Sequence, residues 1–165
     1  TQRTLRAALR LAFEHAQGGA QLCIADAEAM LEVFGGVAPF QPAASRATTW
    51  SCDDGYMTKR LRGVRIDDEL FTAVFRDFTT HSAEDRWPRD YPDEEARGKP
   101  KDGAFLMSTN GYRVKCCAKL LGLMPVAAWP NVGTKHEAAL GFAWVVEGSF
   151  VVVVSDGGAR HVVVR

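Results

Sequence analysis

Apolar residues at helical spacing dominate the first part of the chain. Between residues 4 and 16 they recur every three or four positions, which predicts an amphipathic helix that stops at Gly18 and Gly19. A second apolar stripe runs from Cys23 to Phe34, so we expect a second helix there. Residues 37–51 hold two prolines and several small side chains, and we expect them to form a connector or an irregular strand.

The middle of the chain contains the clearest helical pattern. Five apolar side chains from Leu70 to Phe78 share one helical face, and Asp67 or Asp68 is placed to cap the N-terminus. A short strand is expected at residues 104–107. A further helix is expected from Asn110 to Leu121, because Asn110 is a favoured N-cap residue and Gly122 follows the last turn.

Residues 84–102 differ from the rest of the chain. They are mostly charged, contain three prolines and offer almost no apolar surface to bury. A segment of this length without its own apolar stripe is usually an exposed loop. We therefore expect residues 84–102 to lack regular structure.

The C-terminal part changes from helical spacing to denser apolar runs. Three successive strands are expected at residues 138–146, 149–154 and 160–164, joined by short glycine-containing turns. The four consecutive valines at 151–154 favour a central strand that is buried on both faces. The whole pattern predicts one α+β domain over residues 1–165, in which N-terminal and central helices pack on a C-terminal antiparallel β-meander.

The composition narrows the classes of function. Lysine plus arginine equals aspartate plus glutamate at 20 each, so no overall positive field attracts nucleic acid. No apolar run approaches the roughly twenty residues that a membrane helix needs. The four cysteines include no C-x-x-C pair, so we expect no structural zinc and no cofactor, and a reducing, cytoplasmic setting.

Cys23 is the first candidate for chemistry. It stands where the second helix is expected to begin, and the unpaired N–H groups and dipole of a helix N-terminus lower the pKa of a thiol. A nucleophilic cysteine needs that environment. Gln17 lies six residues upstream, where its amide is placed to donate to an oxyanion formed beside the sulfur.

His136 is the candidate general base for this thiol. It directly precedes the first expected C-terminal strand, and Asp156 follows the next one. With a two-residue turn between these strands, Asp156 falls opposite Ala139, on the order of 10 Å along the strand from His136. A bend would bring the carboxylate to the imidazole, where it would fix the tautomer and support the imidazolium.

The order of Gln17, Cys23, His136 and Asp156 resembles that of the papain-like cysteine peptidase superfamily. The resemblance implies a small cysteine hydrolase, a thiol protease acting on a protein or peptide substrate. It also implies the roles of the four residues, as oxyanion donor, nucleophile, base and orienting carboxylate respectively. Cys52 is a rival nucleophile in the same scheme, but Asp53 and Asp54 follow it and would raise its pKa.

Two other classes of function stay open. A non-enzymatic binding, inhibitor or structural domain of a larger protein fits a small neutral chain, and Trp87 and Tyr91 would suit a binding epitope. Arg62 followed by residues 77–83 resembles the arginine and serine-rich elements of ADP-ribosyltransferases, with residues 108–110 as a competing match. That resemblance implies NAD binding through a bidentate arginine.

Overall fold

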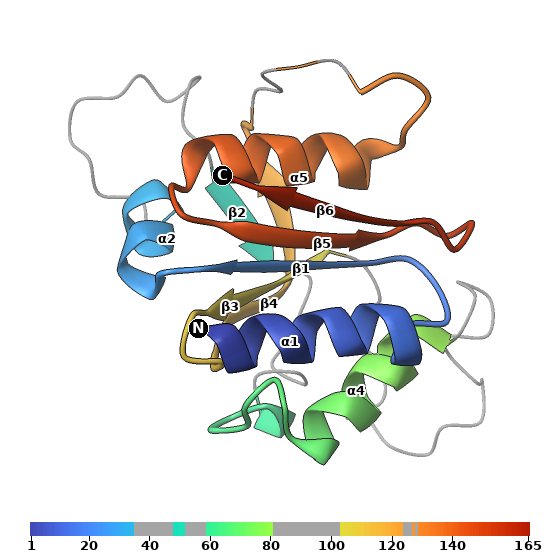
Figure 1. Cartoon of the computed structure of the whole chain (residues 1–165). Helices are drawn as coiled ribbons and strands as arrows, with labels where there is room; N and C mark the ends of the chain where they lie inside the picture. Colours follow the sequence, from blue (N-terminus) through green and yellow to red (C-terminus); the bar gives the residue numbers. More distant parts are fainter. Residues whose placement is uncertain (35–47, 52–58, 81–102, 124–126, 128) are drawn as a thin grey trace.

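The computed structural model describes residues 1–34, 48–51, 59–80, 103–123, 127 and 129–165. Within this part of the chain six strands form one mixed sheet with the order β2-β4-β3-β1-β5-β6 (Figure 1). The strands are β1 (Ala20–Ala25), β2 (Thr48–Ser51), β3 (Ala104–Ser108), β4 (Arg113–Leu121), β5 (Phe150–Val154) and β6 (Arg160–Val164). β1 and β3 run parallel, and the other neighbours are antiparallel.

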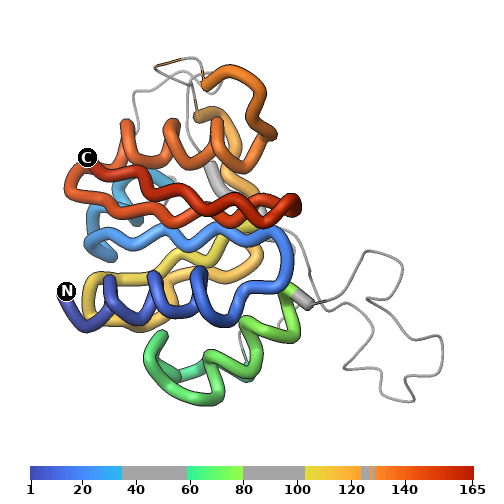
Figure 2. The backbone as a smooth tube through the Cα atoms, turned by 45° about the vertical axis from the view of Figure 1, so that its right-hand side comes forward, coloured from blue at the N-terminus to red at the C-terminus, as the bar shows by residue number. Residues whose placement is uncertain are grey.

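Helices cover both faces of the sheet, as Figures 1 and 2 show from two directions. α1 (Gln2–Arg10) continues into a π-helical turn, η1 (Leu11–His15), and packs on one face with α4 (Glu69–Thr80). α5 (Thr134–Val145) covers the opposite face, where α2 (Ala27–Phe34) also packs. The α+β class expected from the sequence is therefore confirmed.

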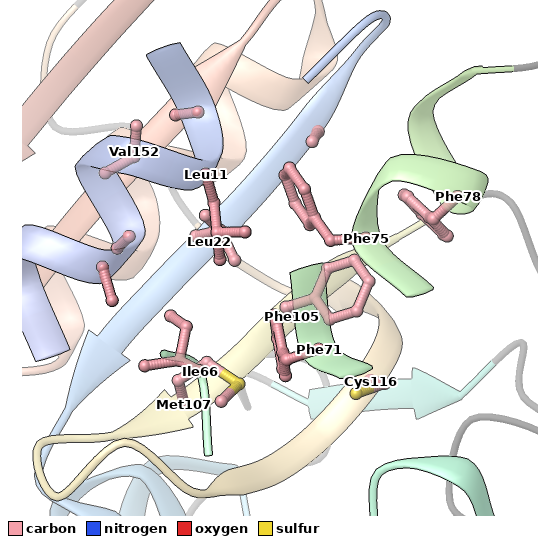
Figure 3. Close-up of a cluster of buried hydrophobic side chains, with 14 of the residues drawn as sticks. Leu11, Leu22, Ile66, Phe71, Phe75, Phe78, Phe105, Met107, Cys116 and Val152 are labelled. Atoms are coloured by element: carbon pink, nitrogen blue, oxygen red, sulfur yellow. The ribbon is translucent and has the colours of Figure 1, made fainter. Parts of the chain in front are cut away.

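Each face of the sheet has its own hydrophobic core. On the α1 and α4 side, Phe105 of β3 lies among Phe71, Phe75 and Phe78, with ring centroids 5.9, 5.7 and 4.9 Å away (Figure 3). On the other side, the ring of Phe142 in α5 stacks on Phe34 at 5.6 Å. The alternation of side chains along a strand divides β1 between the two cores.

The prediction of a helix that begins at Cys23 is wrong for residues 23–25. Residues 20–25 form β1, a central strand whose six residues are all buried. Neighbouring strands on both sides satisfy its backbone, and both faces are covered, so the run is apolar without strict alternation. The helix starts only at Ala27, after Asp26, whose Oδ1 accepts hydrogen bonds from the amides of Glu28 and Ala29.

The helix expected after Asn110 is also wrong, because residues 113–121 form β4. The side chain of Asn110 accepts from the amide of Tyr112 at 3.2 Å and so stabilises a turn instead of capping a helix. Gly111 has φ 91°, which suits the tight turn between β3 and β4. The amide of Ser108 donates to the carbonyl of Tyr112 and joins the two sides of this turn.

The first strand of the expected C-terminal meander is a helix, α5. The buried residues Ala139, Phe142, Ala143 and Val146 stand at positions i, i+3, i+4 and i+7, which is the apolar stripe of a helix on a sheet. The remaining two strands are confirmed as the hairpin of β5 and β6. Residues 151–154 are buried between β1 and β6, as the valine run predicts.

Other parts of the sequence prediction hold. The periodic segment from Leu70 to Phe78 lies in α4, and Oδ1 of Asp68 accepts from the amide of Leu70 at 2.8 Å. The short strand at 104–107 is β3. The expected loop at 84–102 and the rival nucleophile Cys52 lie outside the described residues.

Candidate ligand-binding cavity

A cavity of about 690 Å³ opens at one end of the sheet, beneath the N-terminus of α5. β1 and β3 begin at this end and β4 and β5 finish there, which brings the turn between β5 and β6 beside the start of α5 (Figure 1). Its walls include apolar side chains of β4 and α5, such as Leu120, Leu121 and Ala138. The polar groups that line it come from β1, β4, α5 and the β5–β6 turn.

An ion pair joins two of these elements at the cavity. Nζ of Lys135, in the first turn of α5, lies 3.0 and 2.9 Å from the two carboxylate oxygens of Asp156 in the β5–β6 turn. Oδ1 of Asp156 also accepts from the amide of Gly19, 3.1 Å away. A Cβ at position 19 would collide with Nζ of Lys135 and with the Asp156 carboxylate, so the ion pair could not keep this position beside a larger residue.

His136 is the only residue of α5's first turn that is buried, with 5% of its surface exposed. Its ring packs edge to face with Trp129 and with His161 of β6, at centroid distances of 5.0 and 4.9 Å. Neither ring nitrogen has a hydrogen-bond partner among the described residues. Burial lowers the pKa of His136, the charges of His161 and Lys135 act in the same direction, and the Gly133 carbonyl acts against them. Burial therefore favours the neutral form of this imidazole.

The Gln21 amide also lines the cavity, from the first part of β1. The residue is 5% exposed, and its Nε2 donates to Sγ of Cys23 over 3.4 Å. Sulfur is a weak acceptor, so this contact satisfies little of the hydrogen-bonding capacity of the amide. Gln21 was not singled out in the sequence, because its position was read as the approach to a helix and not as the interior of a strand.

The structure corrects the environment predicted for Cys23. The thiol is wholly buried in a central strand and not at a helix N-terminus. Burial raises its pKa well above the ordinary value, and the hydrogen bond from Gln21 opposes this only in part. The premise of an activated thiolate at Cys23 is therefore wrong.

The four residues predicted to act together are separated into two groups. His136 and Asp156 line the same cavity, whereas the described residues that line it include neither Cys23 nor Gln17. Gln17 is exposed in the connection between η1 and β1, where its backbone N–H donates to Oγ1 of Thr79 at 3.2 Å. The Asp156 carboxylate binds Lys135 and Gly19, which differs from the predicted role of orienting His136.

The elements matched to ADP-ribosyltransferases are also dispersed. Arg62 is exposed in a turn and is not among the residues that line the cavity. Thr79 belongs to the end of α4, and residues 108–110 form the turn after β3. Residues 81–83 lie outside the described part of the chain.

Across the described ranges, no three His, Cys, Asp or Glu side chains gather as a metal ion would need. Nor does any helix there have the length and apolar character to cross a membrane. No protein-family model, curated protein or solved structure matches the chain.

Proposed function

We propose that this protein is a binding domain that takes a small ligand, with an apolar body and a polar end, into the cavity beneath α5. A volume of about 690 Å³ falls within the range of small-molecule sites, roughly 300–1,000 Å³. Such sites combine apolar walls with a few placed polar groups. Leu120, Leu121 and Ala138 supply the walls here, and Gln21 and the start of α5 supply the polar groups.

The buried amide of Gln21 is the observation that carries this proposal. Gln21 has a sulfur as its hydrogen-bond acceptor, and the described residues provide its amide with no other partner. A polar ligand in the cavity would offer this amide a stronger hydrogen-bond partner than sulfur.

The cysteine hydrolase remains a prediction, and one observation favours it: His136 and Asp156 lie at one cavity. Against it stand the buried thiol of Cys23, its raised pKa and the binding of Asp156 to Lys135. A hydrolase that uses Cys23 at this site would have to bring the thiol out of the core. The binding domain requires no such rearrangement, and we therefore place it first.

The test is a fragment screen by amide NMR on the whole chain. We expect at least one fragment to shift amides of β1, β4 and the first turn of α5, and Ala138→Phe to abolish the shifts by filling the cavity. Ala159→Phe is the matched control, because Ala159 is exposed in the β5–β6 turn and does not line the cavity. The proposal fails if no fragment binds, or if Ala138→Phe, folded by circular dichroism, binds as well as the wild type.

A further inference from the structure

We propose that the outer edge of β6 pairs with β6 of a second copy of this chain, antiparallel and centred on Val162, so that two sheets join across a twofold axis. This interface goes beyond the proposed ligand binding, which needs no second copy. It follows from the direction of the backbone groups of β6, the exposed valines beside them and the position of the nearest charge.

The hydrogen bonds at both ends of the β5–β6 hairpin fix which backbone groups face β5. The amide of Arg165 donates to the carbonyl of Ser149, and the amide of Ser155 donates to the carbonyl of Ala159. Both pairs continue the register of the two strands. Because hydrogen-bonded and non-hydrogen-bonded pairs alternate along an antiparallel ladder, residues 161 and 163 also direct their N–H and C=O groups to β5.

The alternate residues Arg160, Val162 and Val164 therefore direct their N–H and C=O groups away from β5. β6 is the last strand of the sheet on this side among the described residues (Figure 1). The same part of the chain provides the outward groups of Val162 and Val164 with no hydrogen-bond partner. β6 also contains no proline, and its register with β5 has no bulge that would hinder a further strand.

The side chains beside these outward groups are apolar and exposed. Val162 and Val164 are 43% and 65% exposed, and they share the face of the sheet on which Arg160 contacts η1. Phe13 of η1, whose ring lies 5.7 Å from the Arg160 guanidinium, is 55% exposed. A strand edge of this kind favours association, because β-branched side chains fit well beside a neighbouring strand.

The charge nearest to this edge does not oppose a second copy. The guanidinium of Arg160 donates to the carbonyls of Ala12 and Gly158, both at 2.8 Å, and so lies back on its own chain. In the proposed pairing Arg160 stands opposite Val164 of the other copy. The two arginines are then about 14 Å apart, since four residues of strand separate them. That distance exceeds the Debye length of roughly 8 Å at physiological salt.

The symmetry of the edge is the reason to choose a second copy as the partner. Centring on Val162 forms three residue pairs, 160 with 164, 162 with 162 and 164 with 160, and each pair exchanges two backbone hydrogen bonds. A shift of two residues in either direction pairs one end of β6 with a position outside the strand. The same residues serve both copies, as an isologous interface requires.

The size of the edge sets the strength of the dimer. Stable interfaces bury roughly 1,200–2,000 Å² in total, and a five-residue strand edge with few side chains beside it lies at or below that range. We therefore expect a weak dimer, with a Kd on the order of 50 µM.

The experiment is sedimentation equilibrium of the whole chain between about 10 and 500 µM, which spans the expected Kd. Val162→Lys and Val162→Glu should each weaken the dimer at least about tenfold, because like charges then face each other across the twofold axis. An equimolar mixture of the two variants should associate within about threefold of the wild type, because opposite charges then meet. Leu70→Lys is the matched control, since Leu70 is 42% exposed on α4, and it should change nothing.

Recovery on mixing keeps the test independent of folding, because two misfolded variants would not restore each other. Amide exchange by NMR gives a second measurement: the amides of Val162 and Val164 should become protected as the concentration rises, whereas those of residues 161 and 163 are protected throughout. A chain that stays monomeric over the whole range overturns the proposal. So does a dimer that Val162→Lys leaves intact, or a pair of charged variants that stays monomeric when mixed.

Discussion

The reactivity of Cys23 separates a binding domain from a hydrolase whose nucleophile is Cys23. An unperturbed thiol, with a pKa of about 8.5, is roughly one-tenth ionised at pH 7.5. Burial raises the pKa of Cys23, so its thiolate fraction is lower still. The sulfur also has no access to solvent, because its residue is 0% exposed between the two neighbouring strands.

The expected slowing of alkylation follows from the free energy that is needed to open β1. β1 lies between β3 and β5, and central strands are among the last elements to open. If opening costs about 4 kcal/mol, alkylation slows about a thousandfold relative to the unfolded chain, since each 1.4 kcal/mol is tenfold. We therefore expect iodoacetamide at pH 7.5 to modify Cys23 at least about a thousandfold more slowly than in denaturing urea.

The assay is a time course of labelling, followed by peptide mapping to resolve each cysteine. His136→Gln is the companion variant, and it should not slow the labelling of Cys23, because His136 does not activate this thiol. If Cys23 were an activated nucleophile, the folded protein would be labelled faster than the chain in urea, and His136→Gln would slow that labelling. Labelling of Cys23 faster than in urea, together with a slower rate in His136→Gln, would refute our reasoning and restore the hydrolase.

Three further predictions concern the core, the pH dependence and the turn at the cavity. Phe105→Ala should lower the free energy of unfolding by about 3–5 kcal/mol in urea titrations, because three aromatic rings lose their common partner; a loss below about 1.5 kcal/mol would contradict the packing. The pKa of His136 is lower when folded, so the unfolded chain binds more protons and stability should fall as the pH drops below about 6.5. That fall should be smaller in His136→Phe, and an equal fall in both would assign it to other groups. Gly19→Ala should displace the ion pair of Lys135 and Asp156, since its Cβ collides with the ends of both side chains, and should lower stability by less than about 1 kcal/mol because the pair is exposed; a structure of the variant with both contacts of Lys135 and Asp156 unchanged would contradict this geometry.

Part of the candidate site could be found from the sequence. His136 and Asp156 were selected as polar residues at the ends of apolar segments, and such ends meet at one edge of a sheet. Their partners could not be found in the same way. The contact of Lys135 with Asp156 depends on a helix that begins at Thr134, whereas the sequence pattern predicts a strand that begins only at residue 138. The stripe of Ala139, Phe142, Ala143 and Val146 was the available signal for that helix.

The sequence by itself determined the elements whose pattern has one physical solution. Leu70 to Phe78 follows a helical period with Asp68 before it, and four valines in succession fit the interior of a sheet. The secondary structure of each segment can be predicted from its own residues, because local periodicity and capping do not depend on a distant part of the chain.

Only the tertiary structure decided the state of the short apolar run at residues 20–25. Six buried residues satisfy a strand or the first turns of a helix equally well, and periodicity cannot distinguish them. The choice came from β3 and β5, which lie more than 75 residues away along the chain and pair with β1 on both sides. That pairing fixed the register and put Cys23 and Gln21 on the same face of the sheet, because residues i and i+2 of a strand share a face. Cys23 lies in the core of that face, and Gln21, nearer the start of the strand, lies at the cavity.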